Sequence, residues 1–193
     1  MAPRRKQDRY GRRARREGYP ARSVYKLEEI DRRIRLFKQG QRVLDLGASP
    51  GSWTLFAAER VGRGGRVVGL DLKDPEVALP AHAEIRVLDA FAADPETLGG
   101  PFDVVLSDMA PKTSGQRHAD QYRSYELYTR ALGLASEVLK RGGMFVGKIF
   151  QGAEFDDARA ATRDAFEKVR IIRPEATRDE SYEVFLVGLN KRG

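Results

Sequence analysis

The chain has 193 residues, of which 41% are hydrophobic and 33% charged, so its composition is that of a folded domain and not of a disordered polymer. It has no cysteine and only two histidines, which excludes disulfides, thiolate metal sites, a cysteine nucleophile and a histidine-rich metal centre. The sequence has no apolar run of about 18 residues and no apolar leader, so we expect neither a membrane span nor a secretory signal. The expected location is the cytoplasm.

Positive charge is concentrated near the N-terminus. Residues 1–42 hold 15 of the 35 basic side chains but only five of the 28 acidic ones, and the remainder of the chain is slightly acidic. A basic arm on a near-neutral domain favours a nucleic-acid partner over a merely solvated tail. The arm is assigned to residues 1–20 and is expected to be mobile in the free protein. Tyr10 and Tyr19 lie among its arginines, where they could stack on bases.

Helical and extended patterns alternate after the arm. Apolar residues at helical spacing predict a helix capped by Ser23 and ended by Gly40. Strands are then predicted over 42–47, 65–72, 83–90, 101–110, 144–150, 168–173 and 181–190, with helices over 52–61, about 120–140 and 154–167. Gly142 and Gly143 are predicted to stop the long helix. The near-continuously apolar strands indicate an α/β fold, with a mostly parallel seven-stranded sheet covered by helices on both faces. The loop between the last two strands is too short for a parallel crossover, so an antiparallel C-terminal hairpin is expected.

The segment DLGASPGSW, residues 45–53, joins the first strand to a helix. Gly47 lets the backbone approach a ligand and Gly51 frees the helix N-terminus. The spacing matches neither the dinucleotide fingerprint nor a phosphate-binding P-loop. Asp71 and Asp89 end the next two strands, where carboxylates can receive ribose hydroxyls and an adenine amino group. Each aspartate alone is better explained as a helix cap or loop carboxylate, but together they look like the S-adenosylmethionine site of a Rossmann-like methyltransferase.

Charged residues interrupt three apolar strands. Asp108 ends the fourth strand, Lys148 lies inside GKIFQG and Glu183 lies inside SYEVFLV. A buried lysine is costly unless it is paired or faces a cleft, and burial moves the pKa of a lysine toward the range of a general base. The pattern leaves open a structural ion pair between Lys148 and Glu183, or exposed positions at a sheet edge. Lys26, on the first predicted helix, reads as a surface lysine.

Five segments occur in the order typical of one family: YKLEEID, DLGASPGSW, SDMAPKTSG, GKIFQG and SYEVFLV. From about residue 20 to residue 190 the chain resembles the FtsJ (RrmJ, RlmE) family of RNA ribose 2′-O-methyltransferases. The resemblance implies a single methyltransferase domain over 21–193, with S-adenosyl-L-methionine as methyl donor, S-adenosyl-L-homocysteine as product and no metal. It implies a catalytic tetrad of Lys26, Asp108, Lys148 and Glu183. The cofactor-binding residues expected from the motif and the resemblance are Gly47, Gly51, Trp53, Asp71, Asp89 and Asp108.

The implied tetrad suits the chemistry of a ribose 2′-hydroxyl, which is a weak acid and a poor nucleophile. Lys148 is expected to take the hydroxyl proton, helped by desolvation and by the neighbouring cation of Lys26. Asp108 and Glu183 are expected to orient the two ammonium groups.

The resemblance further implies a substrate: a uridine in the A-loop of 23S ribosomal RNA, within the large ribosomal subunit. A monomer in ribosome biogenesis is expected, with the basic arm on RNA phosphates. The sequence departs from the family at Ser52, where glycine is common, and at Lys112 and Thr113, in a substrate loop. The alternatives are a transfer RNA substrate, or a non-catalytic RNA-binding assembly factor on the same fold. A small-molecule methyltransferase would leave the basic arm unexplained.

Overall fold

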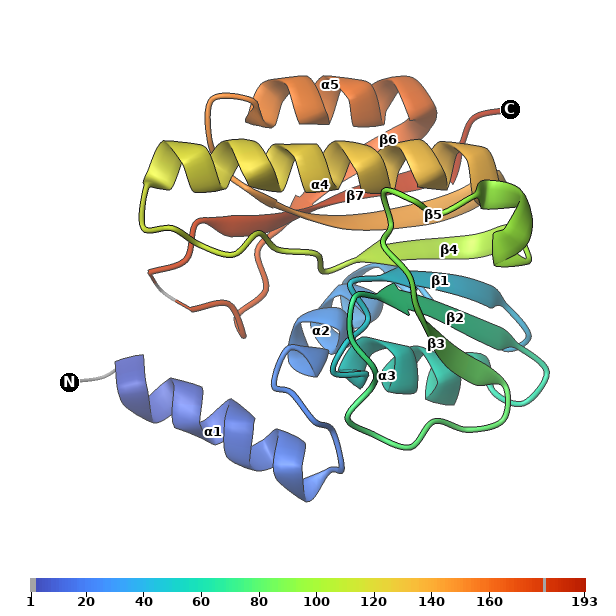
Figure 1. The fold of residues 1–193 in the computed structure, drawn as a ribbon, viewed down its shortest axis with the longest axis horizontal. Helices are drawn as coiled ribbons and strands as arrows, with labels where there is room; N and C mark the ends of the chain where they lie inside the picture. The colour runs from blue at the N-terminus through green and yellow to red at the C-terminus, as the bar shows by residue number, and fades with distance from the viewer. Residues whose placement is uncertain (1–2, 179) are drawn as a thin grey trace.

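A computed structural model describes residues 3–178 and 180–193 (Figure 1). Within these residues seven strands form one sheet in the order β3-β2-β1-β4-β5-β7-β6. The strands are β1 (Arg42–Leu46), β2 (Arg66–Asp71), β3 (Ala83–Val87), β4 (Phe102–Ser107), β5 (Leu139–Phe150), β6 (Phe166–Ile172) and β7 (Glu183–Lys191). The five strands from β3 to β5 pair in parallel, and β7 runs antiparallel to both β5 and β6. The predicted α/β class and the antiparallel C-terminal pair are confirmed.

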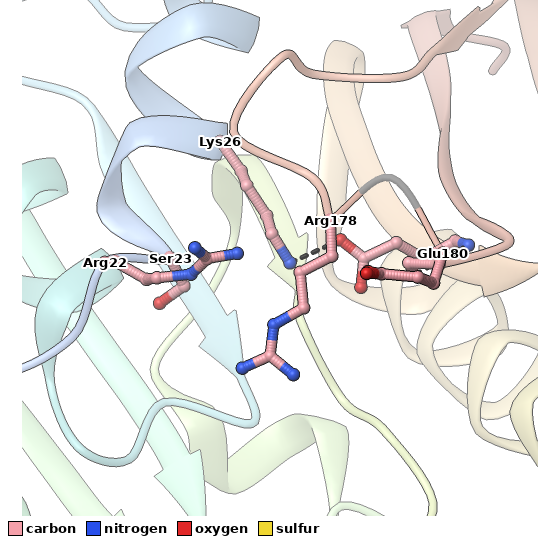
Figure 2. Close-up of a pocket in the computed structure, with 7 residues that line it drawn as sticks. Arg22, Ser23, Lys26, Arg178 and Glu180 are labelled. Carbon is pink, nitrogen blue, oxygen red and sulfur yellow. Dashed lines mark hydrogen bonds and ion pairs between the residues drawn. The ribbon is translucent and has the colours of Figure 1, made fainter. Parts of the chain in front are cut away.

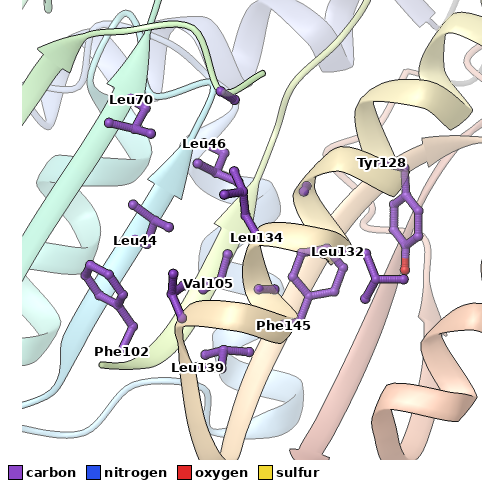
Figure 3. Packing of buried hydrophobic residues seen from close by; sticks show 14 of the residues in the cluster. Leu44, Leu46, Leu70, Phe102, Val105, Tyr128, Leu132, Leu134, Leu139 and Phe145 are labelled. Carbon is purple, nitrogen blue, oxygen red and sulfur yellow. The ribbon is translucent and has the colours of Figure 1, made fainter. Parts of the chain in front are cut away.

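Helices cover both faces of the sheet (Figure 1). The described helices are α1 (Pro3–Arg16), α2 (Val24–Ile34), α3 (Ser52–Val61), α4 (Arg117–Val138) and α5 (Phe155–Ala165), with a short 3-10 turn η1 (Pro95–Leu98). Strand alternation divides the core into two layers. Val43 and Val104 pack on the side of α2 and α3, whereas Leu44 and Val105 pack on the side of α4 and α5 (Figure 3). None of the helices in the described ranges is long and apolar enough to cross a membrane.

From β1 the sheet continues through β2 and β3 on one side, and through β4, β5, β7 and β6 on the other. The strand order therefore reverses between β1 and β4. Open α/β sheets bind ligands at such a point, beyond the carboxyl ends of the strands. This rule places the ligand site where the segments 45–53 and 107–115 leave the sheet.

The long helix ends earlier than the glycine pair predicted. It spans Arg117–Val138, and Leu139 already has extended backbone and pairs with Phe102 of β4. Gly142 and Gly143 lie inside β5, where the β4–β5 register shifts between Phe102 and Val104. The two glycines therefore belong to an irregular strand start and do not stop the helix.

The first helix of the domain is also shorter than predicted. It ends at Ile34, and Arg35 adopts a left-handed conformation with φ of 54°. Phe37 therefore follows the helix, and its backbone N–H donates to Asp31 Oδ1 at 3.1 Å. Ser23 stands at the N-cap but makes no side-chain capping hydrogen bond.

Most of the predicted mobile arm is a docked helix, α1, which ends at Arg16; residues 17–20 are described but not helical, and residues 1 and 2 lie outside the described residues. The Tyr10 ring lies 5.5 Å from the Tyr25 ring of α2, and the Arg13 guanidinium lies 4.2 Å from the Tyr25 ring centroid. Arg13 also donates to Glu28 at 3.2 Å. The Tyr19 hydroxyl donates to Glu59 at 2.5 Å. Both arm tyrosines are half-buried and contact other residues of the protein, and their expected role in stacking on bases stays a prediction.

Candidate functional site

A cavity of about 300 Å³ opens at the carboxyl ends of β1, β2 and β4. Four predicted cofactor residues line it: Gly47, Asp71, Asp89 and Asp108. Leu72 and Phe91 add exposed apolar side chains to the wall, with 69% and 55% of their surface accessible. The cavity thus combines carboxylates with apolar surface, which suits a nucleoside that carries no phosphate.

Backbone geometry holds the cavity wall in shape. Gly47 has φ of +79°, and a Cβ there would come within 2.9 Å of the Met109 backbone nitrogen, so a larger residue would block the turn. Asp71 Oδ2 accepts from the Ser49 backbone N–H at 3.0 Å, which ties the second strand end to that turn. Asp89 Oδ1 accepts from the Phe91 backbone N–H at 2.9 Å. Both aspartates therefore have local structural roles as well as a place in the cavity.

Gly51 and Trp53 are not among the residues that line this cavity. Gly51 is the N-cap of α3 with φ of +112°, and a Cβ there would meet Val77 Cγ1 at 2.7 Å. Trp53 is 3% exposed, and its Nε1 donates to the Ser23 backbone oxygen at 3.0 Å. Its ring lies 5.7 Å from that of Phe185. Their positions make Gly51 a turn residue and Trp53 a link between α3 and the start of α2.

Asp108 and Lys148 form one buried ion pair between adjacent strands. Lys148 is 6% exposed, and its Nζ donates to Asp108 Oδ1 at 2.9 Å and to the Asp108 backbone oxygen at 2.6 Å. The register explains the contact, because Ser107 of β4 lies opposite Gly147 of β5. The Asp108 backbone N–H donates in turn to Leu46 of β1 at 3.1 Å.

Lys26 and Glu183 form a second ion pair, between α2 and the start of β7. Glu183 is 8% exposed, and Thr177 Oγ1 also donates to Glu183 Oε1 at 3.4 Å. Lys26 is therefore not the surface lysine that its helical pattern indicated. The structural alternative of a Lys148–Glu183 pair is also wrong, because the two lysines use different carboxylates.

The Lys26–Glu183 pair borders a second cavity, of about 400 Å³. The guanidinium groups of Arg22 and Arg178 extend into the same space as the Lys26 ammonium (Figure 2). Burial and the nearby Arg178 cation lower the pKa of Arg22 from its usual value. Glu180 contributes a carboxylate to the wall (Figure 2). The cavity thus gathers the basic side chains of Lys26, Arg22 and Arg178 on the side of the Lys26–Glu183 pair.

The family model described as FtsJ-like methyltransferase matches residues 19–191 of the chain. The chain belongs to this family. A protein of Sorangium cellulosum named ribosomal RNA large subunit methyltransferase E is 53% identical over 192 residues, covering 98% of this chain and 91% of the relative. A protein of the same name from Desulfosudis oleivorans is 47% identical, covering 96% of this chain and 91% of the relative.

Solved structures support the FtsJ-like fold. A Plasmodium falciparum chain named as a ribosomal RNA methyltransferase aligns with a TM-score of 0.77 at 22% identity, covering 91% of this chain and all of the other. A Streptococcus thermophilus chain named as a hemolysin aligns with a TM-score of 0.66 at 17% identity, covering 90% of this chain and 67% of the other. At these identities the likeness concerns the fold alone.

This FtsJ-like chain has a buried carboxyl at the first residue of the segment 45–53, to which sequence analysis gave no role of its own. Asp45 is fully buried, and its Oδ2 accepts from Thr54 Oγ1 at 2.7 Å. Its Oδ1 has no hydrogen-bond partner among the described residues. Burial raises the pKa of Asp45 to about 7, and the nearby charges of Asp108 and Asp71 act in the same direction. The sequence signal was an acidic residue inside the apolar strand RVLDL.

Sequence analysis also missed the polar start of α4. Asp120 is 2% exposed and accepts from the Ser114 backbone N–H at 2.8 Å, from Ser114 Oγ at 2.9 Å and from the Gly115 N–H at 3.3 Å. The Ser114 backbone N–H is the main cause of a lowered pKa of Asp120. Asp120 thereby anchors the loop 110–116, which follows Asp108.

The next residues of α4 hold the segment that follows Lys148. The Gln121 side-chain amide donates to the Gln151 backbone oxygen, and Ser124 Oγ accepts from the Phe150 N–H at 3.0 Å. One end of α4 therefore fixes the backbone beyond both members of the Asp108–Lys148 pair. In the described parts of the chain no group of three or more His, Asp or Glu side chains is arranged to hold a metal ion.

Proposed function

We propose that this protein methylates the 2′-oxygen of a ribose in ribosomal RNA, with S-adenosyl-L-methionine as donor. The observation that carries the proposal is the pair of buried lysine–carboxylate contacts at the ends of β4, β5 and β7, next to a carboxylate-lined cavity. The names of the relatives, which align with almost the whole chain, support ribosomal RNA of the large subunit as the substrate. The modified nucleotide that we propose is a uridine in the A-loop of 23S ribosomal RNA.

The residues of the cavity fit the cofactor. Gly47 allows the turn to close against Met109, and both residues line the cavity. We assign the carboxylates of Asp71 and Asp89 to the ribose and adenine polar groups. Leu72 and Phe91 would cover the apolar faces of the base. When bound, S-adenosyl-L-methionine supplies a methyl carbon on a positively charged sulfur, open to in-line attack by oxygen.

The tetrad positions the ribose hydroxyl and removes its proton. Lys148 Nζ is the proton acceptor in its neutral amine form: its two hydrogens donate to Asp108 Oδ1 and to the Asp108 backbone oxygen, and its lone pair takes the hydroxyl proton. Glu183 lies diagonally across the β5–β7 pair from Lys148 and holds the Lys26 ammonium beside the site. A fixed cation there favours the developing negative charge on the 2′-oxygen.

The basic surfaces are proposed to bind the RNA backbone. Arg9, Arg15 and Arg16 are exposed on α1, and Arg22 and Arg178 lie in the cavity next to Lys26. Arginine suits phosphate oxygens because its planar fork donates two parallel hydrogen bonds. We propose that the protein acts as a monomer in the cytoplasm during ribosome biogenesis.

The test is methyl transfer from labelled S-adenosyl-L-methionine to three substrates, each digested to nucleosides afterwards. The substrates are large ribosomal subunits lacking the modification, naked ribosomal RNA and transfer RNA. We expect 2′-O-methyluridine from the large subunits. Label in transfer RNA would keep the chemistry and change the substrate. Bound cofactor with no transfer to any RNA would make the protein an RNA-binding assembly factor.

The role of α1 is tested without removing it, because Tyr10 docks the helix on α2. A variant with Arg9, Arg15 and Arg16 replaced by glutamine keeps the docking contacts. We expect weaker binding to large subunits and a shallower dependence of the dissociation constant on salt, by about 0.7–0.9 in log–log slope for each phosphate that the variant no longer neutralises. An unchanged slope would assign these arginines to solubility only.

A further inference from the structure

Two aromatic rings meet where β5 and β7 end. Phe150 is the last residue of β5, and Tyr182 immediately precedes β7. Their ring centroids lie 4.9 Å apart with an interplanar angle of 73°, so one ring meets the other edge to face. The Gln151 backbone N–H donates to the Tyr182 backbone oxygen at 2.9 Å, which fixes the tyrosine against the strand end. The Tyr182 ring is therefore held in a defined orientation.

An arginine from a distant part of the chain covers this tyrosine. Arg117, the first residue of α4, places its guanidinium carbon 5.2 Å from the Tyr182 ring centroid. Arg117 is exposed and Tyr182 is half-buried, so the contact lies at the protein surface. A guanidinium plane that lies on an aromatic ring can also stack on a nucleobase.

The aromatic pair lies next to the tetrad in the sequence and in the sheet. Phe150 follows Lys148 by two residues, and Tyr182 precedes Glu183 by one. Phe150 lies directly opposite Glu183 in the β5–β7 register. The rings of Phe150 and Tyr182 therefore form a rim directly beside the tetrad.

We infer that Tyr182 and Arg117 form a stacking subsite for a base of the RNA substrate, beside the site of methyl transfer. This inference rests on the proposed RNA substrate. Proteins read unpaired RNA by stacking splayed bases on aromatic rings and guanidinium planes, and such contacts are salt-independent because they carry no phosphate charge. The cation–π contact at the protein surface contributes little to folding, so the Arg117 guanidinium can move from the ring to receive a base without loss of the fold.

The first experiment measures the dissociation constant of a fluorescein-labelled oligouridylate by anisotropy, over a range of potassium chloride concentrations. Tyr182→Ala is expected to weaken binding about tenfold, the order of one base–aromatic stack, with an unchanged salt slope. Tyr182→Phe keeps the ring and is expected to bind within about twofold of the parent protein. A Tyr182→Ala protein that binds like the parent, or that changes only the salt slope, would overturn the inference.

Arg117 is tested by two variants, because an arginine can act through stacking of its planar guanidinium group or through its positive charge. Arg117→Lys keeps the charge and removes the plane, so we expect weaker binding with an unchanged salt slope. Arg117→Ala removes both and is expected to weaken binding further and to flatten the slope. Full binding by Arg117→Lys would show that only the charge matters and would contradict stacking.

The matched control is Arg60→Ala. Arg60 lies 4.6 Å from the Phe56 ring centroid near the C-terminal end of α3, away from the strand ends that carry the tetrad. The Arg60→Ala variant loses a cation–π contact, as the Arg117→Ala variant does, and is expected to leave RNA binding unchanged. The methyl-transfer assay on large subunits separates the two proposals. If the parent protein transferred no methyl group to large subunits but its RNA binding still depended on Tyr182, only the proposed function would be contradicted.

Discussion

Lys148 and Glu183 are diagonal neighbours on one face of the sheet, but they do not pair with each other. The antiparallel register sets Lys148 opposite Phe185 and Glu183 opposite Phe150, so both charged side chains point to the side of α2 and α3. Lys148 instead contacts Asp108, and Glu183 contacts Lys26. Because the two lysines use different carboxylates, the amino groups of Lys148 and Lys26 are positioned independently, which a single Lys148–Glu183 pair could not achieve.

The separate pairs predict that Lys148→Ala abolishes transfer while cofactor binding survives. A general base contributes about 10²–10⁴ in rate, so transfer to large subunits should fall by at least about 100-fold. The affinity for S-adenosyl-L-methionine, measured by calorimetry, should change little, because Lys148 is not among the residues that line the cavity with Asp71 and Asp89.

Lys140→Ala is the matched control for that variant. Lys140 lies on the same strand and pairs with an aspartate of β4, donating to Asp103 Oδ1 at 2.9 Å, but it lies near the other end of the strand. Loss of this exposed pair should leave turnover unchanged. Near-full turnover by Lys148→Ala would show that another group accepts the proton.

The Lys26–Glu183 pair predicts that stability and activity respond differently to single and double replacement. Both side chains are nearly buried, at 13% and 11% exposure. Glu183→Gln leaves the ammonium without its carboxylate, and breaking a buried pair costs about 3–5 kcal/mol. Adding Lys26→Met removes the unpaired charge, so thermal unfolding should return toward that of the parent.

Activity should not return with stability. If the Lys26 cation supports the reacting oxygen, the double variant Lys26→Met/Glu183→Gln is expected to fold well and to transfer methyl groups poorly. Parallel measurements of the unfolding temperature and of turnover distinguish the two roles. Recovery of both quantities in the double variant would make the pair purely structural.

The fold followed from local patterns more readily than the site did. Apolar strands ended by Asp71, Asp89 and Asp108 indicated where the ligand cavity would open, because strand ends of a parallel sheet meet at one edge. The partners of Lys26 and Lys148 could not be read from periodicity, since each carboxylate comes from a distant element. The resemblance to a family supplied the tetrad as a set.

Three features escaped sequence reasoning for physical reasons. Helix α1 has no broad apolar face, and it docks through Tyr10, Ala14 and the charged contacts of Arg13, which a hydrophobic pattern does not report. The anchoring role of Asp120 depends on how the loop 110–116 folds back over it. The position of Gly142 and Gly143 inside β5 depends on pairing with β4.

The Asp120 anchor predicts a change in substrate affinity without a change in cofactor affinity. Asp120→Asn loses the charge that gathers the Ser114 and Gly115 hydrogen bonds, so the loop 110–116 should become less ordered. Binding of RNA must then order the loop 110–116, which costs free energy. We therefore expect KM for large subunits to rise about tenfold while kcat changes less.

Asp156→Asn is the control for the Asp120 variant. Asp156 also lies in the first turn of a helix, α5, but it is exposed, so it reproduces the loss of charge near a helix N-terminus. It should leave KM and kcat unchanged. If Asp120→Asn lowered the affinity for S-adenosyl-L-methionine and the unfolding temperature together, its role would be general folding and not loop placement.

The buried carboxyl of Asp45 predicts a specific dependence of stability on pH. Burial raises its pKa to about 7, whereas an aspartate in the unfolded chain titrates near pH 4. Between about pH 4 and 7 the folded chain therefore holds a proton that the unfolded chain has released, so the free energy of unfolding falls as pH rises. Below this window both states are protonated, and above it both are ionised. A shift of this size corresponds to a loss of at most about 4 kcal/mol.

Asp45→Asn removes this titration while keeping the shape of the side chain and an acceptor for Thr54. Urea unfolding of both proteins from about pH 4.5 to 7.5 gives the difference in stability, in which the other titrating groups cancel. We expect the asparagine variant to gain stability relative to the parent as pH rises through the window. Thr54→Val removes the hydrogen bond that lowers the pKa of Asp45, so it should move the window to higher pH. Parallel stability curves for the parent and Asp45→Asn would show that Asp45 stays ionised in the folded protein.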